Sequence, residues 1–138
     1  MSNRTFTIIK PDSVRKGNFG KIINRIESEG FRILGIKKLG LSQRQAQAFY
    51  AVHKERPFYG SLVEYMTSGP VYVAALERDN AVAELRKLMG ATDPTKADAG
   101  TIRKEFGESI EQNAIHGSDS DENAKIEIAF FFAESELI

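Results

Sequence analysis

Four stretches of the chain have the hydrophobic pattern of β-strands and are rich in β-branched or aromatic residues. They are residues 5–10, 31–41, 71–76 and 126–132. The first, TFTIIK, ends at Pro11, which has no N–H to donate to a neighbouring strand. The second alternates irregularly near Gly35, and the third, VYVAAL, is almost wholly apolar, as in a buried central strand. The fourth, IEIAFFF, is expected to be the last strand.

Between these stretches, apolar residues recur at helical spacing in four segments, each with a start or stop signal. The first is residues 21–30, with Gly30 as C-cap, and the second starts at Ser42, with Gln45 three residues on. The third contains Leu62, Val63 and Met66 and is ended by Gly69 and Pro70. The fourth is capped by Asp79 or Asn80 and ends at Leu88 or Met89. A long irregular stretch follows from Gly90 to Gly100, and loops of this length tend to be functional.

This order of strands and helices predicts an α+β fold in which an antiparallel β-sheet carries helices on one face. A ferredoxin-like topology fits the order best. The 138 residues are expected to form one domain, residues 1–138, because a chain of this length buries about two thirds of its unfolded surface in one core. No internal repeat or linker is present in the sequence.

Composition excludes several functional classes. Nineteen basic residues balance nineteen acidic ones, so we expect no nucleic acid partner and no binding to a charged membrane surface. The absence of cysteine rules out disulfides, zinc–thiolate sites and thiol nucleophiles. It also suits a reducing compartment, and no apolar run is long enough to span a membrane, so we expect a cytoplasmic protein.

Four familiar ligand-binding patterns are incomplete. Gly17 and Gly20 are separated by two residues, whereas a phosphate-binding P-loop needs four. The calcium-loop pattern that starts at Asp119 has Ala124 where its sharp turn needs glycine. The two histidines do not form the HExxH motif of zinc hydrolases, and the aromatic run at 130–132 lacks the surrounding pattern of RNA-binding sheets.

The stretch NAIHGSD, residues 113–119, contains the side chains best suited to catalysis. A neutral imidazole is a good nucleophile and can carry a transferred group, so His116 is chemically suited to covalent catalysis. Gly117 allows close approach of a bulky group, and Ser118 can donate a hydrogen bond. The other histidine, His53, has no comparable setting and is interpreted as a solvated loop residue. A single histidine is more often structural, so the stretch does not decide the function by itself.

Six blocks of the sequence together resemble the nucleoside diphosphate kinase family over nearly the whole chain. They are TFTIIKPDSV, RPFYGSLVEYMTSGPV, LMGATDP, GTIRKEFG, NAIHGSDS and EIAFFF. The resemblance implies transfer of the γ-phosphoryl group of a nucleoside triphosphate to a nucleoside diphosphate, by a ping-pong mechanism through a phosphohistidine. It also implies Mg²⁺ as cofactor, carried by the nucleotide phosphates, with no metal ligands on the protein.

The resemblance assigns a role to each matching residue. His116 would be the phosphorylated residue and Glu127 the carboxylate that orients its ring, while Lys10, Tyr50 and Ser118 complete the catalytic set. A buried glutamate in an apolar segment needs a partner, which favours the Glu127 assignment. The nucleotide-binding residues would be Lys10, Arg86, Thr92 and Arg103 at the phosphates, Asn113 at the ribose, and Phe58, Leu62 and Ile110 at the base. Asp119 is expected to help hold the loop.

Plain structural roles are the alternatives for several of these residues. Without the motifs, Arg86 and Arg103 would be surface arginines, and Tyr50 and Leu62 would be core residues. One departure from the family pattern is Ala99, which stands where many members have proline before GTIR. The resemblance implies a homo-oligomer, a hexamer or tetramer built from dimers. Two other classes stay open: a non-catalytic ferredoxin-like module that senses nucleotides, and an interaction protein that has lost catalysis.

Overall fold

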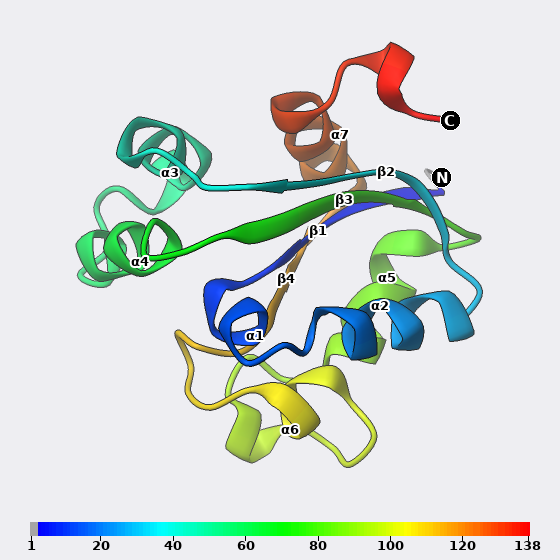
Figure 1. Ribbon diagram of the computed structural model, residues 1–138, viewed down its shortest axis with the longest axis horizontal. Coiled ribbons are helices and arrows are strands. Elements are labelled where there is room, and N and C mark those ends of the chain that lie inside the picture. The colour runs from blue at the N-terminus through cyan, green and yellow to red at the C-terminus, as the bar shows by residue number, and fades with distance from the viewer. Residues whose placement is uncertain (1–2) are drawn as a thin grey trace.

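The computed structural model describes residues 3–138 and contains a four-stranded antiparallel sheet in the order β2-β3-β1-β4. The strands are β1 (Arg4–Ile9), β2 (Arg32–Leu39), β3 (Val71–Glu77) and β4 (Ile115–Gly117). β3 pairs with both β1 and β2, which confirms the central strand predicted from VYVAAL. The pairing of β2 shifts register between Ile33 and Gly35, where irregular alternation was predicted. This strand order confirms the ferredoxin-like topology (Figure 1).

Helices and short 3₁₀ segments connect the strands and follow the last one. They are α1 (Pro11–Arg15), α2 (Phe19–Ser28), α3 (Gln43–Phe49), η1 (Ala51–His53), α4 (Tyr59–Met66), α5 (Ala81–Met89), η2 (Pro94–Lys96), α6 (Ile102–Phe106), α7 (Asp121–Phe131) and η3 (Glu134–Glu136). The four helices predicted between the strands correspond to α2, α3, α4 and α5.

Local signals in the sequence set several of these boundaries. The Ser42 hydroxyl accepts from the Gln45 N–H at 3.1 Å, and the Gln45 side chain accepts from the Ser42 N–H at 2.9 Å, so the predicted capping box is formed. Gly30 adopts a φ of 89° just after α2, a conformation that glycine reaches without strain. Met89 ends α5, as predicted.

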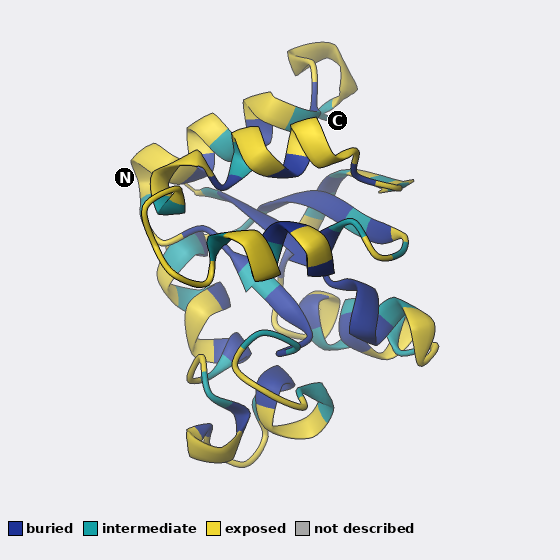
Figure 2. Cartoon of the chain, turned by 90° about the vertical axis from the view of Figure 1, so that its left-hand side faces the viewer, coloured by how far each residue is buried: buried dark blue, intermediate teal, exposed yellow. Residues whose placement is uncertain are grey.

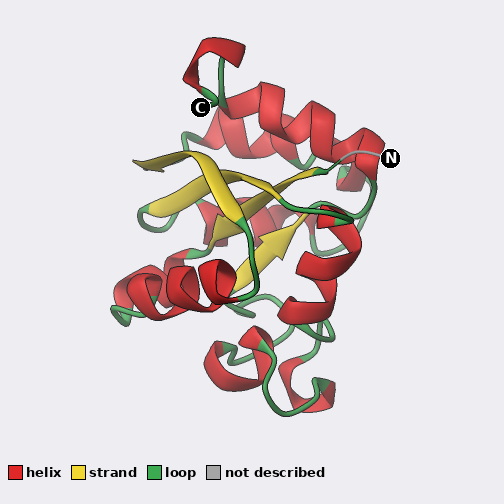
Figure 3. Ribbon diagram, turned by 90° about the vertical axis from the view of Figure 1, so that its right-hand side faces the viewer, coloured by secondary structure: helices red, strands yellow, loops and turns green. Residues whose placement is uncertain are grey.

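Helices cover both faces of the sheet, so the prediction of helices on one face was wrong. Alternate residues of β3 enter two separate cores: Ala74 and Leu76 pack with α2 and α5, while Val73 and Ala75 pack with α4 and α7. Figure 3 shows helices on either side of the sheet, and Figure 2 shows the buried strands between exposed outer helix faces. A strand that is apolar on both faces needs a cover on both.

Residues 121–131 form the helix α7, so the prediction of a last strand at 126–132 was wrong. The Ser120 hydroxyl caps the helix by accepting from the Asn123 N–H at 3.0 Å, and two acidic residues occupy its first turn. Ala124 and Ile128 form its buried side, four residues apart. The last strand is instead the short β4, which lies inside the NAIHGSD stretch.

Candidate active site

A cavity of about 570 Å³ lies beside β4, and it is lined by residues from distant parts of the sequence. It contains all the predicted site residues except Ser118: Lys10, Tyr50, Phe58, Leu62, Arg86, Thr92, Arg103, Ile110, Asn113, His116 and Glu127. Ser118 is buried next to the cavity and contacts Glu127. The fold therefore brings the predicted set together in one place.

His116 occupies the middle of β4, where it pairs with Ile8 of β1. Its ring nitrogen Nε2 lies 2.8 Å from the Glu127 carboxylate oxygen Oε1, and the two side chains are 22% and 19% exposed. Because a carboxylate accepts hydrogen bonds, this contact assigns the proton to Nε2 in the neutral ring. The other ring nitrogen, Nδ1, then keeps its lone pair.

Neighbouring hydroxyl groups fix both partners. The Ser118 hydroxyl donates to Glu127 Oε1 at 2.8 Å, and the Thr7 hydroxyl donates to the main-chain carbonyl of His116 at 2.7 Å. Glu127 is on α7 rather than on a strand, so the predicted partner was right and the predicted element was wrong. A helix and an edge strand thus hold the pair from two sides.

Aromatic side chains surround the His116 ring. Phe49 and Phe6 lie edge-on to it, with centroid distances of 5.6 Å and 6.2 Å. The buried Tyr50 hydroxyl makes no hydrogen bond to residues 3–138. Burial, and to a smaller degree the Glu127 charge, raises the pKa of Tyr50, so its hydroxyl stays a donor at neutral pH.

Three cationic side chains line the same cavity. Lys10 Nζ donates to the Asn113 side-chain oxygen at 2.8 Å and to the Glu111 carbonyl at 3.3 Å. Burial, together with the positive charge of Arg103, lowers the pKa of Lys10 to about 8. Burial also lowers the pKa of Arg103 to about 10, with a further contribution from Arg86. Cations that repel one another in a partly desolvated cleft make a strong local site for an anion.

Hydrogen bonds to the main chain orient the guanidinium groups. Arg103 donates to the carbonyls of Gly90 at 3.1 Å and Ile115 at 2.9 Å, and Arg86 donates to the Gly117 carbonyl at 3.4 Å. These carbonyls belong to β4 and to the end of α5, so both cations are tied to the elements around His116.

Asn113 and Asp119 complete the polar part of the cavity. The Asn113 amide donates to the Thr92 carbonyl at 3.0 Å, which links the 90–100 loop to the segment just before β4. The Asp119 carboxylate accepts from the Asn123 amide at 2.6 Å. This hydrogen bond, more than the charges of Arg86 and His116, lowers the pKa of Asp119.

The outer part of the cavity is apolar and open. Phe58 is 46% exposed and Ile110 is 63% exposed, although both are large hydrophobic residues. Leu62 of α4 lines the same region. Exposed apolar side chains around a cleft are typical of a surface that packs against a ring.

Several cavity residues were not predicted: Phe49, Val52, His53, Glu111 and Asn123. His53 is part of η1 and its ring lies 5.5 Å from that of Phe58, so its interpretation as a solvated loop residue was wrong. Its position between Tyr50 and Phe58 in the sequence was the available signal, because both of those residues were already in the predicted site.

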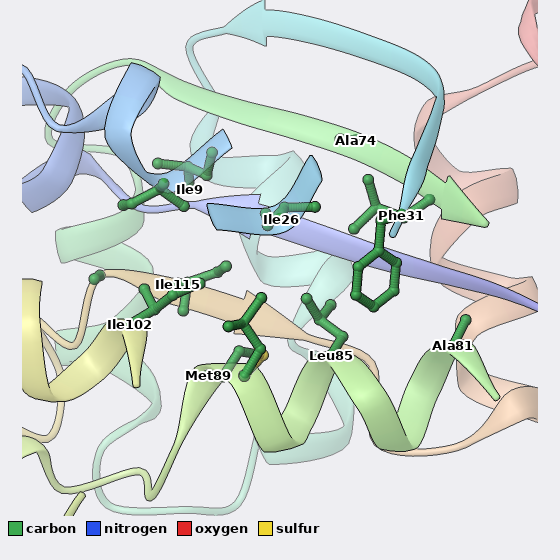
Figure 4. Close-up of a cluster of buried hydrophobic side chains, with 13 residues drawn as sticks. Ile9, Ile26, Phe31, Ala74, Ala81, Leu85, Met89, Ile102 and Ile115 are labelled. Carbon is green, nitrogen blue, oxygen red and sulfur yellow. The ribbon is translucent and has the colours of Figure 1, made fainter. Parts of the chain in front are cut away.

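Gly117 has a packing role that the sequence did not indicate. A Cβ at this position would lie 2.5 Å from the sulfur of Met89 on α5. Met89 and its neighbour Leu85 form part of the core under β4, together with Ile115 (Figure 4). The glycine therefore lets β4 lie directly on α5.

A sequence model of the family described as nucleoside diphosphate kinase matches residues 3–137. The chain belongs to the nucleoside diphosphate kinase family. It is 64% identical to the nucleoside diphosphate kinase of Campylobacter fetus over 134 residues, which cover 97% of this chain and 98% of that one. It is also 62% identical to the one of Nitratiruptor over 135 residues, or 98% of each chain.

Solved structures of this family have the same fold. The Aquifex aeolicus nucleoside diphosphate kinase has a TM-score of 0.97 and 43% identity, with full coverage of both chains. The Halobacterium salinarum nucleoside diphosphate kinase, solved in complex with CDP, has a TM-score of 0.95 and 40% identity over 100% of this chain and 92% of that one.

Membership in the family confirms the predicted activity. The chain is a phosphotransferase that moves the γ-phosphoryl group of a nucleoside triphosphate to a nucleoside diphosphate through a phosphohistidine, in a ping-pong cycle. The alternative of a non-catalytic sensor is not favoured. Within residues 3–138, no helix is both long and apolar enough to cross a membrane.

Proposed function

We propose that His116 is the residue that carries the phosphoryl group and that the 570 Å³ cavity is the nucleotide site. The observation that supports this most strongly is the 2.8 Å contact between His116 Nε2 and Glu127, because it leaves Nδ1 unprotonated. In the first half-reaction the Nδ1 lone pair attacks the γ-phosphorus. The N–P bond forms as the bond to the bridging oxygen breaks, and the nucleoside diphosphate leaves with that electron pair.

Glu127 is the residue that makes the imidazole a sufficient nucleophile. As Nδ1 bonds to phosphorus, positive charge spreads over the ring, and the carboxylate at Nε2 stabilises it. The Ser118 hydroxyl, which shares Oε1, keeps the carboxylate in line with the ring. In the second half-reaction a terminal oxygen of the acceptor diphosphate attacks, the N–P bond breaks, and Nδ1 recovers its lone pair.

The cationic side chains act on the phosphate oxygens. Arg86 and Arg103 each present several donors in a plane, which suits two-point contact with a phosphoryl group. Lys10 contributes a third positive charge, and Thr92 and Tyr50, which also line the cavity, contribute hydroxyl groups. Charge that spreads over these oxygens in the transition state is thereby neutralised.

The nucleoside is held mainly by shape. The base lies between Phe58 and Ile110, with Leu62 beside it, and Asn113 binds the ribose. Apolar contact with the two faces of a ring does not distinguish one base from another, so both purine and pyrimidine nucleotides are substrates.

Mg²⁺ enters the site bound to the nucleotide phosphates. No three His, Cys, Asp or Glu side chains of residues 3–138 gather where they could hold a metal ion, and the phosphate region of the cavity is cationic. This donor set fits a metal that is held by phosphate oxygens rather than by the protein. When bound with the nucleotide, the ion would supply positive charge that offsets part of the charge of the phosphate groups.

The assembly is a homo-oligomer, a hexamer or tetramer built from dimers, and the enzyme acts in the cytoplasm. The family resemblance supports the first statement, and the composition supports the second. In the family the loop around Ala99 often lies at subunit contacts, and Asn113 is joined to the preceding stretch by its hydrogen bond to the Thr92 carbonyl.

The test is to incubate the protein with γ-labelled ATP and Mg²⁺ and to locate the label. We expect an acid-labile, alkali-stable label on His116 that is released when a nucleoside diphosphate is added. His116→Ala should carry no label while keeping the fold, and His53→Ala is the matched control because it removes the other histidine from the same cavity. A label that persists in His116→Ala would contradict the assignment.

A further inference from the structure

Asp12 is a buried carboxylate that the proposed phosphoryl transfer does not use. It is 1% exposed and follows Pro11 in the first turn of α1. Its oxygen Oδ1 accepts a short hydrogen bond from the Tyr65 hydroxyl, and that hydroxyl accepts from the Asp12 N–H at 2.7 Å. Its other oxygen, Oδ2, accepts from the main-chain N–H of Ala114 at 3.1 Å. Both oxygens of a buried charge are thus engaged.

The partner of Asp12 has an unusual backbone. Ala114 has a φ of 77°, which L-residues other than glycine rarely adopt. The N–H of Ile115 donates to the carbonyl of Asn113 at 3.0 Å, so residues 113–115 form a three-residue γ-turn with Ala114 at its centre. A γ-turn with positive φ is strained and persists only where surrounding contacts enforce it.

Two hydrogen bonds from one short segment enforce this turn. Asp12 accepts from the Ala114 N–H, and the Lys10 N–H donates to the Ala114 carbonyl at 2.9 Å. Ala114 itself is fully buried, so water cannot replace either bond. The turn therefore takes its shape from the segment that follows β1.

The turn lies between two parts of the active site. Asn113, its first residue, accepts from Lys10 Nζ and donates to the Thr92 carbonyl. His116 follows one residue after its end, on β4. A change in the backbone at Ala114 would rotate Asn113, the proposed ribose contact, relative to the imidazole of His116. Displacements of about 1 Å can slow an enzymatic step about a hundredfold.

We infer that Asp12 is a positioning residue for phosphoryl transfer, which holds the strained turn at Ala114 and thereby sets His116 against Lys10 and Asn113. The inference rests on the proposed role of His116. Tyr65 has a supporting role, because its hydroxyl fixes the orientation of the Asp12 carboxylate.

The test compares Asp12→Ala, Asp12→Asn and the double variant Asp12→Ala with Ala114→Gly. The measurement is the single-turnover rate of His116 phosphorylation per folded molecule, with the folded fraction taken from circular dichroism. Asp12→Ala should slow this rate about tenfold to a hundredfold. Asp12→Asn, which still offers an oxygen to the Ala114 N–H, should be slowed less.

The double variant separates positioning from general stability. Glycine adopts positive φ without strain, so Ala114→Gly should restore part of the rate that Asp12→Ala loses. Ile22→Val, a methyl deletion in the core under α2, is the control: it lowers stability and should leave the rate per folded molecule unchanged. If Asp12→Ala does not fold, Asp12→Asn and Tyr65→Phe, each alone and with Ala114→Gly, give the same comparison.

Two results would overturn the inference. One is a wild-type rate per folded molecule in the Asp12 variants, and the other is a further loss when Ala114→Gly is added. Failure of the proposed function is distinguishable, because the wild-type protein would then carry no label on His116 at all.

Discussion

Lys10 is a cavity residue whose charge is lost at a lower pH than that of an ordinary lysine. Its pKa is lowered to about 8, mainly by burial, so the free enzyme loses this positive charge as pH rises through that value. In the proposed mechanism, the protonated amine is the form that binds phosphate. We therefore expect kcat/KM, which reports ionisations of the free enzyme, to fall above about pH 8.

Lys10→Arg is the matched control for this pH profile. A guanidinium keeps its charge throughout the range, so the fall near pH 8 should disappear even if the overall activity is lower. Arg103, whose pKa is lowered to about 10, would produce a separate fall at higher pH. An unchanged fall near pH 8 in Lys10→Arg would assign it to another group.

At the residue scale the sequence predicted which residues gather in one cavity, because its motifs identify side chains by type and neighbours. All of the predicted residues lie in or beside the cavity. Of those it missed, Glu111 has no signal in the sequence, whereas His53 could have been found from its position between Tyr50 and Phe58. They belong to the cavity because η1 and the stretch before β4 are adjacent to predicted residues, and adjacency in space is a property of the fold.

At the scale of elements, α7 shows where pattern and context compete. The run IEIAFFF has strand-forming residues, but the Ser120 cap and the acidic first turn start a helix before it. Packing of Ala124 and Ile128 against the sheet then decides in favour of the helix. The three-residue strand β4 escaped prediction because so short an element has no periodicity to detect.

The Ser120 cap should therefore contribute measurably to stability. Ser120→Ala removes the acceptor of the Asn123 N–H and should lower the free energy of unfolding by about 1 kcal/mol, as seen in the midpoint of denaturant unfolding. Ser120→Asp keeps an acceptor at the same position and should retain most of that stability. Equal destabilisation by both variants would show that the cap is not the cause.

The contact between β4 and α5 leads to a second prediction at this scale. Gly117→Ala places a methyl group against the Met89 sulfur and should destabilise the protein by about 1–3 kcal/mol. Met89→Ala vacates the same space. The double variant of Gly117→Ala and Met89→Ala should therefore lose less stability than the sum of the losses of the two single variants. Additive effects in a double-mutant cycle would mean that the two residues do not compete for space.

At the scale of the whole molecule, the apolar pattern of β3 predicted a buried sheet, and the net charge predicted that no large charged surface is present. The nearly apolar β3 indicated a buried sheet, yet the cover on its second face was missed because α7 had been assigned to the sheet. The net charge of zero indicated no extended charged surface, and the positive charge needed for phosphate is concentrated in one cavity.

The proposed homo-oligomer is testable on the intact protein. Analytical ultracentrifugation should give a mass corresponding to four or six copies of the 15.4 kDa chain at micromolar concentration. Ala99 stands where many family members have proline, in a loop that often lies at subunit contacts in the family, and it gives this loop more freedom. If the loop lies at such a contact here, Ala99→Pro should raise the concentration of denaturant needed to dissociate the assembly. A species of 15.4 kDa would contradict the proposed assembly.

Residues 121–138 join the His116 ring to the opposite edge of the sheet. This segment supplies Glu127 to His116, and the Ile138 N–H donates to the Leu34 carbonyl on β2. A local opening of the segment would therefore take the carboxylate from the imidazole and uncover β2 in the same event. Amide hydrogen exchange should then show α7 and β2 losing protection together.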